Sequence, residues 1–316
     1  MAKFILQIDG GGIRGIMPAV VLEKLEEVTG KPCHKIFDLI TGTSTGAIIA
    51  GMLGIGVPAA RLRRLYVDDG AMLFRKRSWW KRLLGAKYSR VAMQEIMRQQ
   101  IKIYADGPKF GDAKTRVMTT TFNGSSGRSH FQMSWNDYHA GLDTIDVVSW
   151  SALSAILYFG PIGVPDYEYK LEYQRTKPIR TRGAVFYDGG QGRNNCTLLE
   201  AVTTGMDLGW VGHEDVHVLS IGTGAPRLFV PYRQANNRNK VQRIGDYIGQ
   251  SREEAVYDQI HKVATMAEST PGLDIHRLDC IIEDDENKLD ALKYVNEFVE
   301  YGDLMAKDLS EVFLGA

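Results

Sequence analysis

Three glycine-rich motifs contain the residue types that acyl-transfer chemistry requires. They are Asp9-Gly10-Gly11-Gly12-Ile13-Arg14-Gly15, Gly42-Thr43-Ser44-Thr45-Gly46 and Asp188-Gly189-Gly190. In this order they supply a loop of backbone N–H groups, a serine on a sharp turn and a carboxylate that can accept a proton. These are the parts of a serine acyl hydrolase, which attacks a carbonyl carbon and stabilises the oxyanion that forms.

The serine motif has the form Gly-x-Ser-x-Gly over residues 42–46. It follows an expected strand and precedes an expected helix, which is the context of a nucleophile elbow. A serine on so tight a turn has a strained backbone and needs small neighbours, and the helix amino terminus behind it favours negative charge. Because such a pentapeptide is often only a turn, Ser44 by itself leaves a catalytic and a structural interpretation open.

The first motif also matches Gly-x-Gly-x-x-Gly, a pattern that occurs in dinucleotide-binding sites. A dinucleotide site needs an acidic residue at the end of the second strand to hold the ribose. Here the expected second strand runs directly into residues 42–44, which favours an oxyanion hole made from the N–H groups of the loop. Each donor would contribute about 3 kcal/mol in the transition state. Arg14 could shape this loop, contact an anionic head group or be paired structurally.

Asp188 directly follows the expected strand 184–187. An aspartate at a strand end is commonly a turn residue or a helix cap. Placed against Ser44, it could instead accept the hydroxyl proton during attack. Its ordinary pKa of about 3.9 is low for a general base at neutral pH. Either burial must raise that pKa, or the N–H donors must carry most of the catalysis.

A histidine could in principle complete a triad. His213 and His217 follow Ser44 and Asp188, which is the Ser–Asp–His order of α/β-hydrolases. Those enzymes place several strands before the elbow, whereas a single strand–helix unit precedes Ser44 here. We therefore interpret all seven histidines as structural or surface residues.

The elements that would position these motifs alternate between strands and helices. We expect strands at 4–8 and 37–41, and a buried helix at 47–53. Between the strands, a helix opens at Met17-Pro18 and ends at residues 30–32, with an apolar face made by Val20, Val21, Leu22, Leu25 and Val28. With further strands at 116–122 and 216–221, this order predicts a three-layer α/β/α fold with a mainly parallel central sheet.

The rest of the chain offers no convincing domain boundary. We expect a single domain over residues 1–316, with the motifs within 3–225 and a helical carboxyl-terminal part at 226–316. In that part, apolar residues recur at helical spacing after the acidic cluster 283–286, namely Leu289, Leu292, Val295, Phe298 and Val299.

The bulk composition excludes several classes of protein. The 38 basic residues balance the 38 acidic ones, so no overall charge attracts a nucleic acid polymer. The three cysteines, Cys33, Cys196 and Cys280, lack the spacing of a disulfide framework or a zinc site. No signal peptide and no run of about 20 apolar residues is visible. We expect a cytoplasmic protein that meets a membrane only at its surface.

Together the three motifs resemble those of patatin-like phospholipases. In that family a D-G-G-G-x-[RK]-G loop precedes a G-x-S-x-G elbow by about thirty residues, and a D-G-[GA] motif follows. The segments 151–159 and 218–224 resemble weaker family features, so the likeness spans about residues 3–225. Where the family usually has a proline, this chain has Ile156. The resemblance therefore does not determine the shape of the acyl channel.

This resemblance implies a catalytic dyad without histidine, metal or cofactor. Ser44 would be the nucleophile and Asp188 the base, and Gly10, Gly11 and Gly12 would line the oxyanion hole. The remaining motif residues would support these parts, namely Arg14, Gly15, Gly42, Gly46, Gly189 and Gly190.

The reaction implied is that of a lipid acyl hydrolase of the phospholipase A1 or A2 type, acting on phospholipid at the inner membrane face. Some bacterial members of the family resemble antiphage effectors switched on by cyclic nucleotides, so a cyclic-nucleotide activator and a homo-oligomer are further partners to consider. Acyl transfer or thioester hydrolysis on the same fold is one alternative. A nucleotide- or lipid-binding module with an inert serine is another.

A basic segment at 74–90 suits a lipid surface. It carries two tryptophans among seven cations and no acid, namely Trp79, Trp80, Arg75, Lys76, Arg77, Lys81, Arg82, Lys87 and Arg90. The alternative is that the tryptophans pack on the core or on a second subunit while the charges face solvent.

Overall fold

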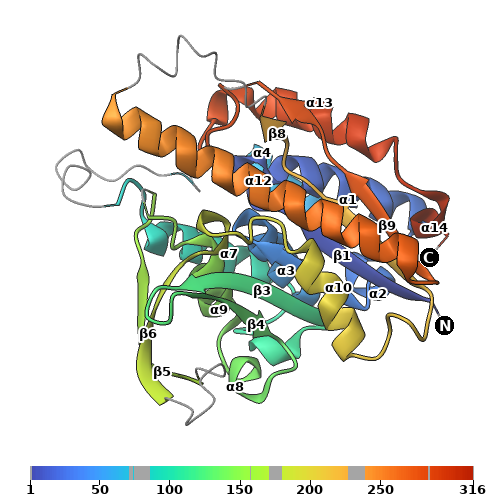
Figure 1. The fold of residues 1–316 in the computed structure, drawn as a ribbon, viewed down its shortest axis with the longest axis horizontal. Coiled ribbons are helices and arrows are strands. Elements are labelled where there is room, and N and C mark those ends of the chain that lie inside the picture. The colour runs from blue at the N-terminus through green and yellow to red at the C-terminus, as the bar shows by residue number, and fades with distance from the viewer. Residues whose placement is uncertain are drawn as a thin grey trace.

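A computed structural model describes residues 2–70, 74, 86–156, 158–170, 180–226, 239–283 and 285–315. Within these ranges an eight-stranded sheet is covered by helices (Figure 1). Its order is β5-β6-β3-β2-β1-β7-β9, and β4 also pairs with β3. The strands of this sheet are β1 (Lys3–Ile8), β2 (Leu39–Thr43), β3 (Arg116–Asn123), β4 (Arg128–Met133), β5 (Ile162–Lys170), β6 (Arg180–Asp188), β7 (Val216–Ile221) and β9 (Leu273–Leu278).

The centre of the sheet is parallel and one side of it is antiparallel. β1 pairs in parallel with β2 and β7, and these pair in parallel with β3 and β9. β4 and β6 run antiparallel to β3, and β5 runs antiparallel to β6. The central strands read as short apolar runs because both of their faces are covered. The predicted α/β fold with a mainly parallel sheet is confirmed.

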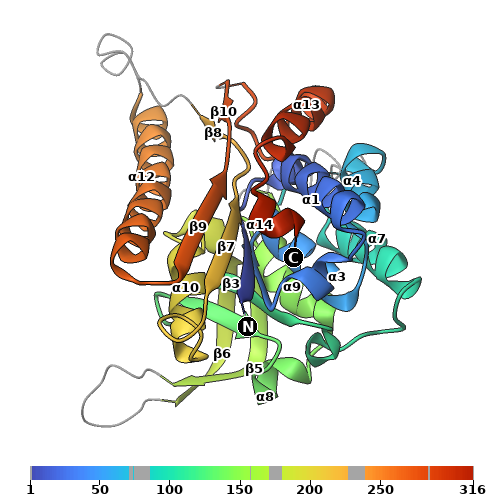
Figure 2. The same ribbon diagram turned by 90° about the vertical axis from the view of Figure 1, so that its right-hand side faces the viewer.

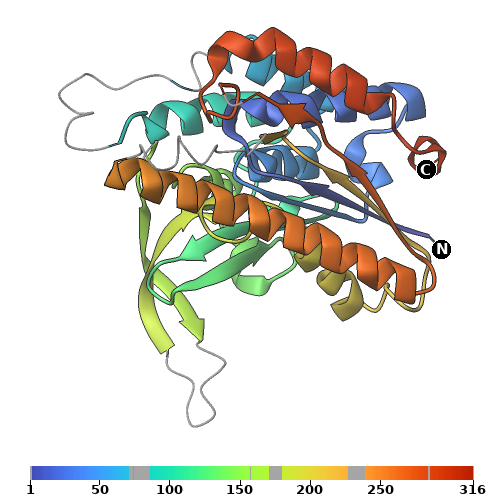
Figure 3. The same cartoon turned by 45° about the horizontal axis from the view of Figure 1, so that its top comes forward.

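Helices lie on both faces of the sheet (Figure 2). Alternate residues of β1 point to opposite sides. Ile5 belongs to the core under α10 and α12, whereas Leu6 and Ile8 belong to the core under α1 and α3. Figure 3 shows α12 running along the sheet. The helices are α1 (Ile16–Thr29), α2 (Cys33–Ile36), α3 (Thr45–Ile55), α4 (Ala59–Val67), α7 (Arg90–Lys102), α8 (Asp137–Ala140), α9 (Thr144–Ala152), α10 (Leu198–Asp207), α12 (Lys240–Ser269), α13 (Val295–Ala306) and α14 (Glu311–Leu314).

The first helix and second strand differ slightly from expectation. α1 ends at Thr29 and is capped by Gly30, whose left-handed φ of 65° suits a glycine. Val28 does not belong to the apolar face, because it is 52% exposed in the last turn, beyond the last buried position at Leu25. The second strand starts at Leu39, because Phe37 closes α2 by donating its N–H to the carbonyl of Cys33.

The carboxyl-terminal part is mostly helical, as expected, with α12, α13 and α14, but it also contains two strands that the sequence did not reveal. β9 adds an edge strand to the main sheet beside β7, and β10 (Ile281–Ile282) pairs with β8 (Ala225–Pro226). Leu289 and Leu292 also lie outside α13, which begins at Val295. The spacing of the apolar residues suggested a longer helix. Leu289 is instead held at the first glycine motif, where its carbonyl accepts a hydrogen bond from the Ile13 N–H.

The three cysteines are free, with Cys33 and Cys196 buried and Cys280 partly buried. None of the described helices combines the length and the apolar character needed to cross a bilayer. Of the basic segment 74–90, residues 75–85 lie outside the described residues. The two described cations of the segment have partners within the protein: Lys87 pairs with Asp290, and Arg90 donates to main-chain carbonyls that include Leu153.

Candidate active site

Strands β2 and β6 end against the same edge of β3. The last residue of β2, Thr43, faces Thr120 in a parallel register. The last residue of β6, Asp188, faces Thr121 in an antiparallel register. Because β4 occupies the other edge of β3 over these positions, the carboxyl ends of β2 and β6 meet head-on. Ser44, which follows β2 directly, is thereby brought to Asp188.

Ser44 lies on a strained turn between β2 and α3. Its φ of 55° makes it the single non-glycine residue with positive φ in the described ranges. The flanking positions, Gly42 and Gly46, have no room for a side chain. A Cβ on Gly42 would lie 2.3 Å from the Gly46 carbonyl, and one on Gly46 would lie 2.3 Å from the carbonyl oxygen of Ile8. The predicted elbow geometry is confirmed.

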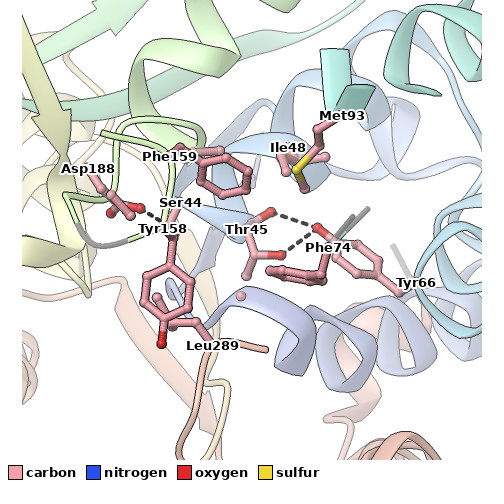
Figure 4. Close-up of a pocket in the computed structure, with 13 residues that line it drawn as sticks. Ser44, Thr45, Ile48, Tyr66, Phe74, Met93, Tyr158, Phe159, Asp188 and Leu289 are labelled. Atoms are coloured by element: carbon pink, nitrogen blue, oxygen red, sulfur yellow. Dashed lines mark hydrogen bonds between the residues drawn. The ribbon is translucent and has the colours of Figure 1, made fainter. Parts of the chain in front are cut away.

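Ser44 and Asp188 form a buried hydrogen-bonded pair (Figure 4). Ser44 Oγ donates to Asp188 Oδ2 at 2.7 Å, and the Gly190 N–H donates to Asp188 Oδ1 at 2.8 Å. Burial raises the pKa of Asp188 to about 6, while the hydrogen bonds from Ser44 and Gly190 and the charge of Arg252 act in the opposite direction. The carboxylate is therefore ionised at neutral pH and more basic than an exposed aspartate.

The first glycine loop lies beside this pair. The Gly10 N–H donates to the carbonyl oxygen of Asn195 at 3.0 Å, so Gly10 offers no free donor, contrary to our expectation. It is nevertheless adjacent to the serine, because a Cβ on Gly10 would lie 3.0 Å from Ser44 Cβ. Within the described part of the chain, the amides of Gly11 and Gly12 have no protein acceptor. Gly12, with φ of 62°, lines the cavity at Ser44.

Arg14 is built into the loop rather than exposed to solvent. It is 2% exposed, its Nε donates to the Gly11 carbonyl at 3.3 Å, and its Nη1 donates to Asn287 Oδ1 at 2.7 Å. Burial lowers the pKa of Arg14 to about 10. These contacts favour the interpretation that Arg14 shapes the donor loop.

The remaining motif glycines permit close packing around the pair. A Cβ on Gly15 would lie 2.3 Å from Thr45 Oγ1, and one on Gly189 would lie 2.8 Å from the Thr120 carbonyl oxygen. A Cβ on Gly190 would lie 2.5 Å from Asn195 Oδ1.

A narrow apolar cavity opens beside Ser44 (Figure 4). Its volume of about 20 Å³ has room for one or two water molecules and none for an acyl chain. Ile156 is not part of its wall and is 49% exposed. The cavity is lined by Gly12, Ser44, Thr45, Ile48, Tyr66, Phe74, Met93, Ala152, Ala155, Tyr158, Phe159, Asp188 and Leu289.

Several residues that support the site were not identified from the sequence. The Ser44 N–H donates to Ser151 Oγ at 3.1 Å, and Thr223 Oγ1 donates to the Gly10 carbonyl at 2.7 Å. The Leu289 carbonyl accepts from the Ile13 N–H at 2.8 Å. Thr223 stood in a visible strand-to-turn motif, but no local pattern connects Leu289 with a loop that lies far from it in sequence.

Among the residues that the structure describes, no histidine hydrogen bonds to the side chain of Ser44 or Asp188. His217 is near Asp274 at the edge of the sheet, with its Nδ1 3.4 Å from Asp274 Oδ2. His130 and His139 are joined through the hydroxyl of Tyr167. In the described ranges, no three histidine, cysteine or acidic side chains are grouped as a metal site.

Comparison with known proteins gives one family for most of the chain. The family model described as patatin-like phospholipase matches residues 6–202. The chain is similar to the cGAMP-activated phospholipase of Pseudomonas aeruginosa (strain BWHPSA011 / Pa011), with 38% identity over 40% of this chain and 38% of that protein. It is also similar to the cUMP-AMP-activated phospholipase of Escherichia coli, with 28% identity over 70% of this chain and 64% of that protein.

These matches span less than two thirds of either relative's length. Among solved structures, the chain is similar to VipD from Legionella pneumophila, at 13% identity and a TM-score of 0.40, over 94% of this chain and 66% of that chain.

Proposed function

This chain belongs to the patatin-like phospholipase family, and on that premise we propose that it hydrolyses phospholipid acyl esters through an acyl-serine intermediate. The observation that carries the proposal is the 2.7 Å hydrogen bond from Ser44 Oγ to Asp188 Oδ2, beside the glycine loop that contains Gly11 and Gly12. The pair would need no histidine, because burial makes the carboxylate basic enough to accept the hydroxyl proton.

The reaction would proceed in two steps. In the first, Asp188 takes the Ser44 proton while Oγ attacks the ester carbonyl, and the resulting oxyanion is bound by the amides of Gly11 and Gly12. The C–O bond to the lysolipid then breaks, and its oxygen takes the proton from Asp188. In the second step, Asp188 deprotonates a water that attacks the acyl-serine, the Ser44 oxygen leaves and recovers a proton, and fatty acid is released.

We also propose that a cyclic nucleotide activates this chain. Two relatives are named as phospholipases activated by cGAMP and by cUMP-AMP. A cavity of about 20 Å³ at Ser44 supports the need for an opening step before an acyl chain can enter.

The proposed place of action is the membrane surface. The five cations Arg75, Lys76, Arg77, Lys81 and Arg82 would attract anionic lipid, whereas Lys87 and Arg90 already have internal partners. Neutralising the five should weaken binding to anionic vesicles and spare hydrolysis of a short soluble ester. Equal loss of both would argue against the proposal.

We further propose that residues 1–316 act as a single domain. Strand β9, which lies beyond the family match, pairs with β7 in the main sheet.

The experiment that tests the activity is lipid profiling by mass spectrometry with wild type, Ser44→Ala and Asp188→Ala, each with and without a panel of cyclic di- and trinucleotides. We expect lysolipid and fatty acid from the wild type alone. An active-site fluorophosphonate should label wild type and not Ser44→Ala. Transfer of the acyl group to an added lysolipid in preference to water would indicate an acyltransferase. A folded wild type that is never labelled, with or without nucleotide, would indicate a binding module.

A further inference from the structure

The glycine loop is anchored by residues that lie beyond the family match, which ends at residue 202. Thr223 bonds the Gly10 carbonyl, Leu289 bonds the Ile13 amide and Asn287 bonds Arg14. A fourth anchor, Arg277 on β9, binds the carboxylate of Asp9 at the head of the loop. Of the four, it is the one that brings a buried formal charge.

Arg277 and Asp9 form a two-pronged ion pair. Arg277 Nη2 lies 2.6 Å from Asp9 Oδ2, and Nη1 lies 3.2 Å from Asp9 Oδ1. Nη1 also donates to Ser220 Oγ at 2.8 Å, and Nη2 to Asp279 Oδ2 at 2.6 Å. The side chain of Asp9 is 5% exposed and that of Arg277 is 15% exposed. Because the planar guanidinium binds both oxygens of the Asp9 carboxylate, it fixes the orientation of that carboxylate as well as its position.

Asp9 in turn determines where the loop starts. Its own N–H donates to the Ile221 carbonyl at 3.0 Å, and Gln7 Nε2 donates to its Oδ1 at 2.8 Å. The next residues carry the amides proposed to bind the oxyanion. Without Arg277, the almost completely buried carboxylate of Asp9 would lack a positively charged partner beside the glycine loop. It would then turn toward other donors or repel the negative charge that develops on the oxyanion.

We propose that Arg277 is a positioning residue for the hydrolysis: by fixing and neutralising Asp9, it holds the glycine loop in the arrangement that stabilises the oxyanion. This rests on the function proposed above. Arg277 would act without touching the substrate, so its loss should lower the rate of attack by Ser44 and leave KM little changed.

The test compares Arg277→Gln, Asp9→Asn and the double variant, by the rate of fluorophosphonate labelling of Ser44 and by kcat and KM for a short soluble ester. We expect Arg277→Gln to lower the labelling rate and kcat by about 100-fold, as misplaced catalytic groups do. Its KM should stay within about twofold of wild type. The double variant should react faster than Arg277→Gln, because it removes the uncompensated charge at Asp9 and leaves only that of Asp279, whose side chain is more exposed.

Lys3→Gln is the matched control. It removes a partly buried ion pair with Asp38, 3.2 Å long, at the opposite end of β1 from the loop. We expect it to label at the wild-type rate. Arg277→Lys keeps the charge but loses the two-pronged geometry, and should react at a rate between those of wild type and Arg277→Gln.

The proposal is overturned if folded Arg277→Gln labels within about twofold of wild type, or if the effects of Asp9→Asn and Arg277→Gln multiply in the double variant. If Arg277→Gln does not fold, Arg277→Lys and the double variant are measured in its place. Labelling of Arg277→Lys at the wild-type rate would then overturn the proposal. Absence of labelling in the wild type itself would instead refute the proposed hydrolase.

Discussion

The hydroxyl of Thr43 hydrogen bonds to that of Thr120, its partner in register across β2 and β3. Thr43 Oγ1 also donates to the Asn194 carbonyl at 2.6 Å, in the loop that follows Asp188. The residue before the proposed nucleophile is thus tied both to the central sheet and to the segment after the proposed base. Ser44 and Asp188 are held by strand ends, which places catalytic groups more accurately than loops do.

The raised pKa of Asp188 gives a prediction for stability. Its folded pKa of about 6 exceeds the unfolded value of 3.8, so burial favours the protonated form. The native state therefore loses stability relative to the unfolded state as pH rises from about 4 through about 6, by up to about 3 kcal/mol. Asp188→Asn cannot lose a proton and should escape this loss.

Urea unfolding of both proteins at pH 4.5 and 7.5 checks this prediction. The free energy of unfolding of wild type, minus that of Asp188→Asn, should be smaller at pH 7.5 than at pH 4.5. A difference that stays constant or rises would contradict the raised pKa.

The strained backbone of Ser44 reverses a common ranking of substitutions. Alanine usually stabilises a protein relative to glycine, because it restricts the unfolded chain. At φ of 55° and ψ of −119°, however, a Cβ is unfavourable. We expect Ser44→Gly to be about 1 kcal/mol more stable than Ser44→Ala. Both variants lack the hydroxyl, so thermal unfolding of the pair isolates the strain, and a more stable alanine variant would show that the turn is relaxed.

Gly12 and Gly30 form a matched pair of left-handed glycines, with φ of 62° and 65°. A Cβ at Gly30 would meet nothing within 4 Å, whereas one at Gly12 would lie 2.3 Å from the Leu289 carbonyl oxygen. Gly30→Ala should therefore cost only backbone strain, about 1 kcal/mol, and leave labelling unchanged. Gly12→Ala should destabilise the protein further and slow fluorophosphonate labelling by at least about tenfold. Equal behaviour of the two variants would argue that Leu289 does not pack on the loop.

Met93 and Met97 test the wall of the cavity. Both are buried on α7, but only Met93 lines the cavity at Ser44. Each change to alanine should cost about 2–5 kcal/mol of stability, so assays belong well below the melting temperature. Met93→Ala should raise kcat/KM for a butyrate ester relative to an acetate ester by about fourfold per methylene accommodated. Met97→Ala should leave that ratio unchanged, and a shift in both would indicate general loosening.

Local sequence determined much of the fold because its signals are steric and short in range. The glycines around Ser44, the glycine that ends α1 and the apolar run of β7 each impose their conformation within a few residues. The exposure of Val28 and the edge strand β9 were missed, because burial and strand pairing depend on distant neighbours.

The sequence by itself supplied the serine, the carboxylate and the glycine loop, since each motif carries its own backbone requirement. Only the tertiary structure determined how these parts are arranged and which partners they contact. It brought Ser44 to Asp188 through the shared edge of β3, engaged the Gly10 amide with Asn195, and anchored Asp9 with Arg277. Such contacts join residues more than a hundred positions apart. No local pattern encodes them, because they arise only once the sheet order is set.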